Sequence, residues 1–229
     1  MLKAVILAGG RGERLKPITD STPKPMIRIK GKPFLEHQLE LLKNNKISEI
    51  LLCVGYRKDA IMDYFGDGCR FGLTIEYSIE NGFLGTAGAL KQAKDYLPAD
   101  FILLYGDSYL PIDYIELIKF WARCSCNALV VCYDNSVKIA ENNIYLGPDG
   151  RIGSYSKRNP VTQANYVEAG VSLLRKEVLN LIPVGREVSL EEEIFPVLIQ
   201  AQQLNGYPIS QRYYDIGTPG RLKEIEGIL

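Results

Sequence analysis

Residues 7–26 read LAGGRGERLKPITDSTPKPM, and Leu7 is also the last residue of a short apolar segment over 3–7. An apolar segment of this length predicts a buried strand, so the glycines lie where a strand gives way to a loop. Glycine has no Cβ atom, and the backbone N–H groups of a glycine-rich loop can therefore close around an anion. The same stretch carries four cations, Arg11, Arg14, Lys16 and Lys24. Its composition predicts a loop that binds phosphate.

Two widespread phosphate-binding motifs do not fit this loop. The P-loop requires Gly-x-x-x-x-Gly-Lys-Ser/Thr, and the chain contains no such run. The dinucleotide fingerprint requires Gly-x-Gly-x-x-Gly, but after Gly10 and Gly12 the position of the third glycine is occupied by Leu15. The loop therefore belongs to another class of phosphate site.

The complete run from Leu7 to Met26 resembles the opening motif of the sugar-1-phosphate nucleotidyltransferases, also called nucleotide-sugar pyrophosphorylases. The resemblance extends over nearly the whole chain, with four motifs in the family's order. It implies transfer of a nucleotidyl group from an NTP to a sugar 1-phosphate, with pyrophosphate as the second product. It also implies catalytic roles for Arg14, on the leaving phosphates, and for Lys24, on the α-phosphate. The residues implied in nucleotide binding by this loop are Leu7, Ala8, Gly9, Gly10, Arg11 and Gly12.

The composition argues against several other classes of protein. The 229 residues carry 27 basic and 27 acidic side chains, so an extended nucleic-acid surface is not expected. No apolar run reaches the roughly 18 residues of a membrane span, and the first apolar segment is too short for a signal peptide. Five scattered cysteines without a histidine cluster indicate reduced thiols rather than a zinc site. We expect a cytoplasmic protein that does not bind membranes.

Strand and helix patterns alternate through the first half of the chain. This order is typical of an α/β fold with a doubly wound, mostly parallel, Rossmann-like sheet, which binds ligands at the carboxyl ends of its strands. We predict strands over 3–7, 49–54, 73–77 and 101–105, and helices over 33–44, 57–65, 86–96 and 112–123.

The second half of the chain predicts a smaller antiparallel layer, which would lie over the sugar site. Its strands are predicted over 128–133, 144–146, 151–155 and 167–174. A capping box from Ser189 to Glu192 opens a predicted helix over 189–200, and the acidic run 191–193 suits the positive end of its dipole. A last helix is predicted over 218–228. No linker is evident, so we predict one domain over 1–229, with a nucleotide-binding half at 1–126 and a sugar-binding half at 127–229.

The segment from Glu80 to Gly88 follows a predicted strand and opens a predicted helix. Gly85 permits a tight turn there, and Thr86 is placed to cap the helix. Glu80 can accept two hydrogen bonds from guanine N1–H and N2–H, whereas uracil and thymine present only N3–H. The string LGTAG also resembles the base- and sugar-contacting loop of mannose-1-phosphate and heptose-1-phosphate guanylyltransferases, which implies GTP. The region 66–73 resembles sugar uridylyltransferases, so the base stays open.

Two aspartates follow predicted extended segments. Asp107 ends an apolar strand beside Gly106, and Asp215 precedes a glycine turn and the final helix. Carboxylates at strand ends suit a hard divalent cation that bridges phosphate oxygens. The resemblance implies that Asp107 and Asp215 bind Mg²⁺, and that Asp107 thereby takes part in catalysis.

The expected sugar site lies in the second half. Many members of the resembled family carry a Glu-Lys pair where this chain has Lys157 and Arg158. The resemblance implies that one of these two cations binds the sugar phosphate, and that Glu168 and Gly170 complete the site, with Glu168 on sugar hydroxyls. A solvated, charged hairpin would produce the same pattern, so the identity of the sugar stays open.

Three other functions share parts of this pattern. A GT-A glycosyltransferase would need an Asp-x-Asp pair, but Asp107 is followed by Ser108 and Tyr109. A non-catalytic, nucleotide-sugar-binding regulatory subunit would not need the complete set of charged residues. A cytidylyltransferase for choline phosphate or another non-sugar phosphate would differ in its substrate. The oligomeric state also stays open, and a homodimer is compatible with the sequence.

Overall fold

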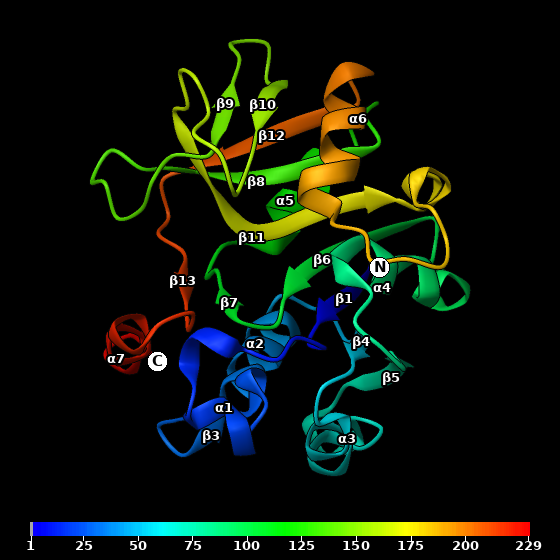
Figure 1. Ribbon diagram of the computed structural model, residues 1–229, viewed down its shortest axis with the longest axis vertical. Coiled ribbons are helices and arrows are strands. Elements are labelled where there is room, and N and C mark those ends of the chain that lie inside the picture. The colour runs from blue at the N-terminus through cyan, green and yellow to red at the C-terminus, as the bar shows by residue number, and fades with distance from the viewer. Residues whose placement is uncertain (1) are drawn as a thin grey trace.

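The computed structural model describes residues 2–229 and contains a nine-stranded mixed sheet (Figure 1). The strand order is β10-β9-β11-β6-β1-β4-β5, and β8 pairs with β11 and β12 beside this path. The strands are β1 (Lys3–Leu7), β4 (Glu49–Val54), β5 (Thr74–Ile79), β6 (Asp100–Tyr105), β8 (Ala128–Asp134), β9 (Ile144–Leu146), β10 (Ile152–Tyr155), β11 (Tyr166–Arg175) and β12 (Leu204–Ile209). Two short antiparallel sheets are formed by β2 (Arg28–Ile29) with β3 (Lys32–Pro33) and by β7 (Ser108–Tyr109) with β13 (Tyr214–Asp215).

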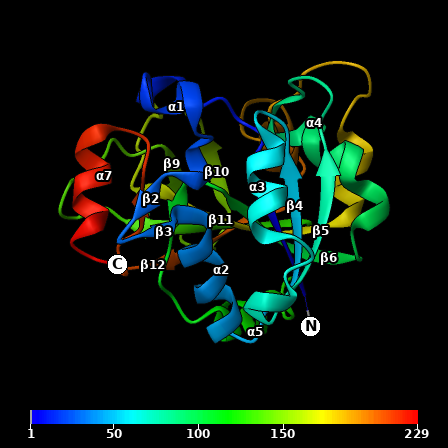
Figure 2. The ribbon, with the colours of Figure 1, turned by 90° about the horizontal axis from the view of Figure 1, so that it is seen from below.

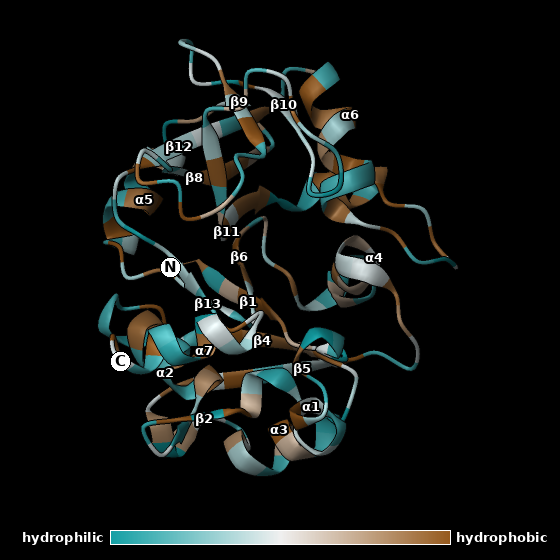
Figure 3. Ribbon diagram, turned by 60° about the vertical axis from the view of Figure 1, so that its left-hand side comes forward, coloured by the Kyte–Doolittle hydropathy of each residue, from teal (hydrophilic) through white to brown (hydrophobic). Residues whose placement is uncertain are grey.

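Apolar side chains cover both faces of the large sheet. Ala4 and Ile6 of β1 belong to one buried cluster, and Val5 between them belongs to another. Side chains of α2, α3 and α5 join the first cluster, and side chains of α4 and α6 join the second. Figure 2 shows β4 and β5 between α3 and α4. Figure 3 shows brown, hydrophobic residues along the strands and teal, hydrophilic residues on the outer helices and loops. The helices are α1 (Ile18–Ser21), α2 (Phe34–Asn44), α3 (Lys58–Phe65), α4 (Gly85–Gln92), α5 (Tyr114–Trp121), α6 (Phe195–Gln200) and α7 (Pro219–Glu226).

The parallel part of the sheet aligns the carboxyl ends of four strands. β1 pairs in parallel with β4 and β6, and β4 pairs in parallel with β5. The last residues of these strands, Leu7, Val54, Ile79 and Tyr105, therefore lie along one edge. This arrangement confirms the predicted fold class, and this edge holds the glycine-rich loop.

The antiparallel strands continue the same sheet. β11 pairs antiparallel with β6, where Val171 lies opposite Leu104, and it also pairs antiparallel with β8. The long strand β11 thus links the parallel strands to the strands of the second half.

One strand of the second half was absent from the sequence-based expectations. β12 pairs in parallel with β8, from Leu204 opposite Ala128 to Ile209 opposite Tyr133. Gly206 and Pro208 interrupt the alternating apolar pattern that would announce a strand. The pairing with β8, which local sequence does not encode, makes the segment a strand.

The helix predicted over 189–200 has the expected capping contact, but its first turn is wound differently from an α-helix. The Ser189 hydroxyl accepts a 3.1 Å hydrogen bond from the Glu192 backbone N–H, so the capping contact is present. The first turn, Leu190–Ile194, is a π-turn, and α6 follows with Pro196 in its own first turn. Wide turns of this kind often occur at functional sites.

Across residues 2–229, no helix combines the length and apolar character that crossing a bilayer requires.

Candidate active site

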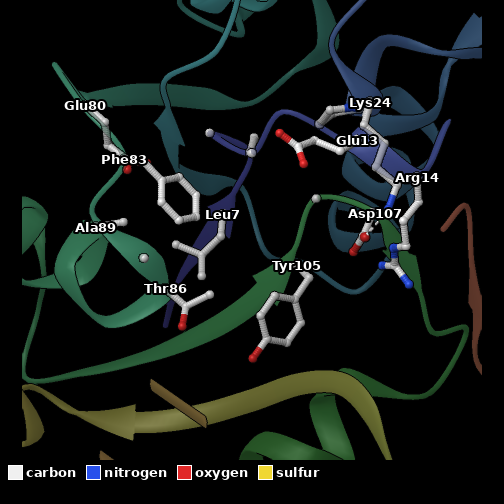
Figure 4. A pocket seen from close by; sticks show the side chains of 17 residues that line it. Leu7, Glu13, Arg14, Lys24, Glu80, Phe83, Thr86, Ala89, Tyr105 and Asp107 are labelled. Atoms are coloured by element: carbon white, nitrogen blue, oxygen red, sulfur yellow. Dashed lines mark hydrogen bonds and ion pairs between the residues drawn. The ribbon is translucent and has the colours of Figure 1, made fainter. Parts of the chain in front are cut away.

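A cavity of about 370 Å³ opens at the carboxyl edge of β1 and β6. Figure 4 shows Glu80, Phe83, Thr86 and Ala89 toward one end, and Lys24, Arg14 and Asp107 toward the other. The predicted site residues that line the cavity are Leu7, Ala8, Gly9, Gly10, Gly12, Arg14, Lys24, Glu80, Gly85, Thr86 and Asp107. The segments that follow β1, β5 and β6 thus meet around one concave surface.

Two glycines let the backbone come close enough to form this cavity. A Cβ atom on Gly9 would collide with the Glu80 carboxylate and would lie 3.3 Å from the Gly55 backbone nitrogen. A Cβ atom on Gly106 would lie 2.9 Å from the carbonyl oxygen of Leu7. Gly10 differs, because a Cβ atom there would meet no described atom within 4 Å. Gly9 and Gly106 therefore serve internal packing, whereas Gly10 leaves open space.

Lys24 and Asp107 form an ion pair at one end of the cavity. Lys24 follows the glycine-rich loop and is only 8% exposed. Burial alone would raise the pKa of Asp107, but the charge and the hydrogen bond of Lys24 hold it below its ordinary value of 3.8. Asp107 is therefore a carboxylate at neutral pH, and a cation already lies beside it.

The backbone brings Asp215 close to Asp107. In the β7–β13 pair, Asp215 lies opposite Ser108, and the Ile216 N–H donates a 3.0 Å hydrogen bond to the Asp107 carbonyl. The Asp215 side chain accepts hydrogen bonds from the Gly217 N–H at 2.7 Å and from Arg221 at 2.5 Å. Asp107 thus lies in the turn between β6 and β7, and Asp215 lies on β13, the strand that pairs with β7.

The donor set at this position fits a magnesium ion that is shared with substrate phosphates. Among the described residues, no cluster of three or more His, Cys, Asp or Glu side chains could hold a metal by protein ligands alone. Mg²⁺ commonly takes one or two carboxylates and completes its coordination with water and phosphate oxygens. Asp107 and Asp215 supply two such carboxylates.

Glu80 borders the opposite end of the cavity. Burial raises the pKa of its carboxyl to about 7, and a hydrogen bond from the Leu84 backbone opposes part of this shift. The side chain therefore changes its charge near neutral pH. It can accept hydrogen bonds from a ligand as a carboxylate, and can donate one when it is protonated.

Lys157 and Arg158 are both exposed, but the ammonium of Lys157 contacts two buried carboxylates. The Lys157 ammonium lies 2.9 Å from Glu168 Oε2 and 3.0 Å from Glu191 Oε1, and it sits 4.3 Å from the ring centre of Tyr105. Burial would lower the pKa of Lys157, but the two carboxylates outweigh burial and raise it. Lys157 is therefore a fixed cation near the cavity wall formed by Tyr105.

Glu168 is buried on β11 with one carboxylate oxygen unpaired. Its Oε2 atom accepts hydrogen bonds from Lys157 and, at 2.8 Å, from the Tyr155 hydroxyl. Its Oε1 atom is buried and receives no hydrogen bond from any described residue. A buried acceptor without a donor is costly, so this oxygen needs a donor that the described residues do not supply.

Glu191 connects Thr86 of α4 to Lys157. It is buried, and its carboxylate accepts hydrogen bonds from the hydroxyls of Thr86 at 2.6 Å, Ser189 at 2.9 Å and Tyr105, in addition to the contact with Lys157. Burial would raise the pKa of Glu191, but Lys157 and these hydroxyls lower it to about 2. One carboxylate thus joins the helix at one end of the cavity to the fixed lysine.

The profile of the nucleotidyl transferase family matches residues 3–227. The chain belongs to the nucleotidyl transferase family. It is 31% identical to UTP–glucose-1-phosphate uridylyltransferase from a Synechocystis strain, over 100% of this chain and 63% of that protein. It is also 31% identical to mannose-1-phosphate guanylyltransferase from Mycobacterium tuberculosis, over 94% of this chain and 61% of that protein. The chain therefore spans less than two thirds of the length of these curated relatives.

A solved structure matches this chain along its whole length. HddC from Yersinia pseudotuberculosis, crystallised as a complex with GMP-PN, superposes with a TM-score of 0.83 at 26% sequence identity. The match covers 100% of this chain and 99% of HddC. The fold described above is therefore that of a known nucleotide-binding structure.

Six predicted site residues do not line the cavity: Arg11, Lys157, Arg158, Glu168, Gly170 and Asp215. Lys157, Glu168 and Asp215 are described above, and the other three lie as follows. Arg11 lines a neighbouring cavity of about 210 Å³, together with Tyr56. The exposed Arg158 is held only through its backbone N–H, which donates to Ser156. Gly170, at φ +79°, would place a Cβ atom 2.7 Å from Ser108 Cβ, so it lets β11 pass close to β7.

One interpretation of the sequence was wrong, and another was incomplete. Thr86 does not cap α4, because Leu84 occupies the cap position; the Thr86 hydroxyl instead bonds to Glu191 and to the Leu190 N–H. Glu191 lies in the acidic first turn of the helix, as the sequence predicted, but its side chain is buried in the site and binds Thr86, Tyr105 and Lys157. A signal for this burial was present: Glu191 precedes the buried Ile194 by three residues, which places both on one helical face.

Proposed function

We propose that this chain transfers a nucleotidyl group from an NTP to a sugar 1-phosphate, which gives an NDP-sugar and pyrophosphate. The proposal rests on the convergence of Lys24, Asp107 and the glycine-rich loop on one cavity. Asp215 lies nearby on β13, which pairs with β7 directly after Asp107. Nucleotidyl transfer needs cations around a triphosphate, and this end of the cavity supplies them.

The reaction needs no covalent intermediate with the protein. An oxygen of the sugar phosphate attacks the α-phosphorus in line, the new P–O bond forms, and the bond to the bridging oxygen of the leaving pyrophosphate breaks. The backbone of the glycine-rich loop and the guanidinium of Arg14 would hold the β- and γ-phosphates. Lys24 would contact the α-phosphate and the attacking oxygen, and so neutralise the charge that builds up between them.

Asp107 and Asp215 would hold Mg²⁺, which supplies electrostatic screening between the two phosphate groups that react. Asp107 pairs with Lys24 in the structure, so the same carboxylate also orients the proposed catalytic lysine. This shared position would keep Lys24 at the α-phosphate end of the cavity.

The second half of the chain would bind the sugar phosphate. Lys157, rather than Arg158, is the proposed phosphate ligand, because its ammonium lies beside the cavity wall at Tyr105. The unpaired oxygen of Glu168 would accept a hydrogen bond from a sugar hydroxyl. Under this proposal residues 1–126 bind the nucleotide, and residues 127–229 bind the sugar and contribute the second metal ligand.

GTP and mannose 1-phosphate or a heptose 1-phosphate are the proposed substrates. The two acceptor oxygens of Glu80 support guanine, and the GMP-PN complex of HddC and the guanylyltransferase from M. tuberculosis agree with this choice. The uridylyltransferase relative from Synechocystis keeps UTP, with another sugar 1-phosphate, as the alternative.

The decisive experiment measures pyrophosphate release with the four common NTPs, each combined with a panel of sugar 1-phosphates, with and without Mg²⁺. We expect the largest signal from GTP with mannose or heptose 1-phosphate, and none without the metal. A signal confined to another pair would replace the proposed substrates. Binding of a nucleotide-sugar without any pyrophosphate release would instead indicate a regulatory subunit and would overturn the proposed activity.

A further inference from the structure

Each proposed metal ligand is already paired with a cation of the chain. Asp107 contacts Lys24, and the Oδ2 atom of Asp215 lies 2.5 Å from Arg221. The other oxygen of Asp215 accepts the 2.7 Å hydrogen bond from the Gly217 N–H. Both oxygens of Asp215 are therefore occupied by donors, and a divalent cation must compete with a guanidinium for this carboxylate.

The backbone that carries Arg221 is held in place. Arg221 lies in the first turn of α7, and its N–H donates to the hydroxyl of Thr218, which caps the helix. Ile216 and Ile225, which flank this turn, are buried together with apolar residues of β2 and α2. Figure 1 shows α7 in red beside the blue N-terminal segment that carries the glycine-rich loop. Arg221 can therefore leave Asp215 only by a movement of its side chain.

The exposure of the two partners makes such a movement feasible. The side chain of Arg221 is 40% exposed, whereas that of Asp215 is 14% exposed and tied to the Gly217 backbone. An ion pair with one partly solvated member is weak, because water stabilises the guanidinium after release. The carboxylate keeps its position, and the arginine can exchange with another cation.

We propose that Arg221 is an internal counter-ion of Asp215, and that it gives up this carboxylate when a divalent cation binds. The inference rests on the proposed function, because it takes Asp215 as a metal ligand. Arg221 competes with free metal and weakens its binding. A nucleotide that carries the metal brings extra phosphate ligands and outcompetes the arginine. Arg221 therefore makes metal binding depend on the nucleotide.

The test measures Mn²⁺ binding to the nucleotide-free protein by the electron paramagnetic resonance signal of free Mn²⁺. We expect Arg221→Gln to bind Mn²⁺ about fivefold more tightly than wild type, in line with the loss of one partly exposed ion pair. Arg221→Lys keeps the charge and should stay close to wild type. Lys223→Gln is the matched control, because it removes an exposed cation from the same helix two residues further along, and we expect no change.

The outcomes separate this inference from the proposed function. If Arg221→Gln binds Mn²⁺ like wild type while Asp215→Asn loses affinity, Asp215 is a ligand and the counter-ion role is overturned. If Asp215→Asn binds like wild type, Asp215 is not a ligand and both proposals for this residue fail. An equal gain in Lys223→Gln and Arg221→Gln would indicate only a general charge effect, and it would also overturn the inference.

A second measurement follows the contact between Arg221 and Asp215 directly in the wild-type protein. The Nη1 atom of Arg221 donates to Asp215, so the Nη–H resonance of Arg221, assigned by its absence in Arg221→Lys, reports on this contact. We expect this resonance to shift when Mg²⁺ is added together with a non-hydrolysable GTP analogue. An unshifted resonance at saturating metal and nucleotide would show that the pair persists, and would overturn the inference.

Discussion

The Thr86 hydroxyl donates a 2.6 Å hydrogen bond to Glu191, which follows it by 105 residues. Thr86 lies in the first turn of α4, beside the end of the cavity proposed for the base, and Glu191 also holds the proposed sugar-phosphate ligand Lys157. A change at either end of this link reaches the other through a single buried carboxylate. The two proposed substrate sites are thus physically connected.

Replacement of Glu191 by Gln should lower stability in a pH-dependent way. The pKa of Glu191 is lowered to about 2 from its ordinary value of 4.5, so its contribution is fully present above pH 4.5 and is lost as the pH falls toward 2. At pH 7 we expect a loss of roughly 3 kcal/mol in the free energy of unfolding. Urea unfolding at several pH values measures the difference from wild type. Glu177→Gln, an exposed change, is the control. A difference that stays constant down to pH 2 would contradict the assignment.

Lys24→Ala should reduce turnover at least about 100-fold, because it removes a cation placed at the proposed point of charge development. Pyrophosphate release at saturating substrates measures the change. The exposed Lys223 provides a matched lysine, and Lys223→Ala should retain wild-type turnover. A near-normal rate for Lys24→Ala would remove this residue from the mechanism.

Lys157→Met and Arg158→Met should differ in their effect on the sugar phosphate. Lys157 contacts Glu168 and Glu191, whereas Arg158 is exposed. We expect Lys157→Met to raise the KM for sugar 1-phosphate at least about tenfold, with a smaller change in the KM for NTP, because an ionic contact of this kind is typically worth 1.5–3 kcal/mol. The increase for Arg158→Met should be clearly smaller. The reverse order would transfer the proposed role to Arg158.

Glu80→Gln should weaken the preference for GTP over UTP by about tenfold in kcat/KM, because it replaces one of two acceptor oxygens with a donor. The pKa of Glu80 is raised to about 7, so its carboxylate form becomes dominant only above neutral pH. The wild-type preference for GTP should therefore increase from about pH 6 to about pH 8, while that of Glu80→Gln stays flat. Competition between the two nucleotides at each pH measures this ratio. A pH-independent ratio in wild type would exclude Glu80 as the base-reading group.

Gly106→Ala and Gly10→Ala should separate packing from ligand approach. A Cβ atom on Gly106 would press on the Leu7 carbonyl at 2.9 Å, so we expect a loss of about 1–3 kcal/mol in the free energy of unfolding. A Cβ atom on Gly10 meets no described atom, so stability should change little while the KM for NTP rises. Thermal unfolding and steady-state kinetics measure the two effects. Equal destabilisation by both changes would contradict this distinction.

The sequence predicted the parallel part of the fold well because its signals are local. The strand predicted over 49–54 has the bounds of β4, since the unbroken apolar run of a doubly covered strand is visible without any knowledge of its neighbours. The glycine-rich loop and Asp107 follow such strands directly. Their meeting at one cavity therefore required only the rule that parallel strands end at one edge.

The features that were missed depend on contacts between distant segments. Glu191 is the first of three consecutive glutamates, and its partners Thr86 and Lys157 lie far from it in the sequence. β12 contains a glycine and a proline, and its pairing with β8 makes it a strand. The choice between Lys157 and Arg158 was open in the sequence for the same reason: the direction of each side chain is set by the elements that pack beside it.

The antiparallel register between β11 and β6 limits how the protein can respond to its ligands. Val171 to Arg175 pair residue by residue with Leu104 to Asp100. The strands of the proposed nucleotide-binding and sugar-binding halves are therefore joined by hydrogen bonds in one sheet. A hinge rotation of one half against the other would break the pairing between β11 and β6. We therefore expect any closure on a substrate to occur by rearrangement of the loops around the cavity rather than by movement of one half against the other.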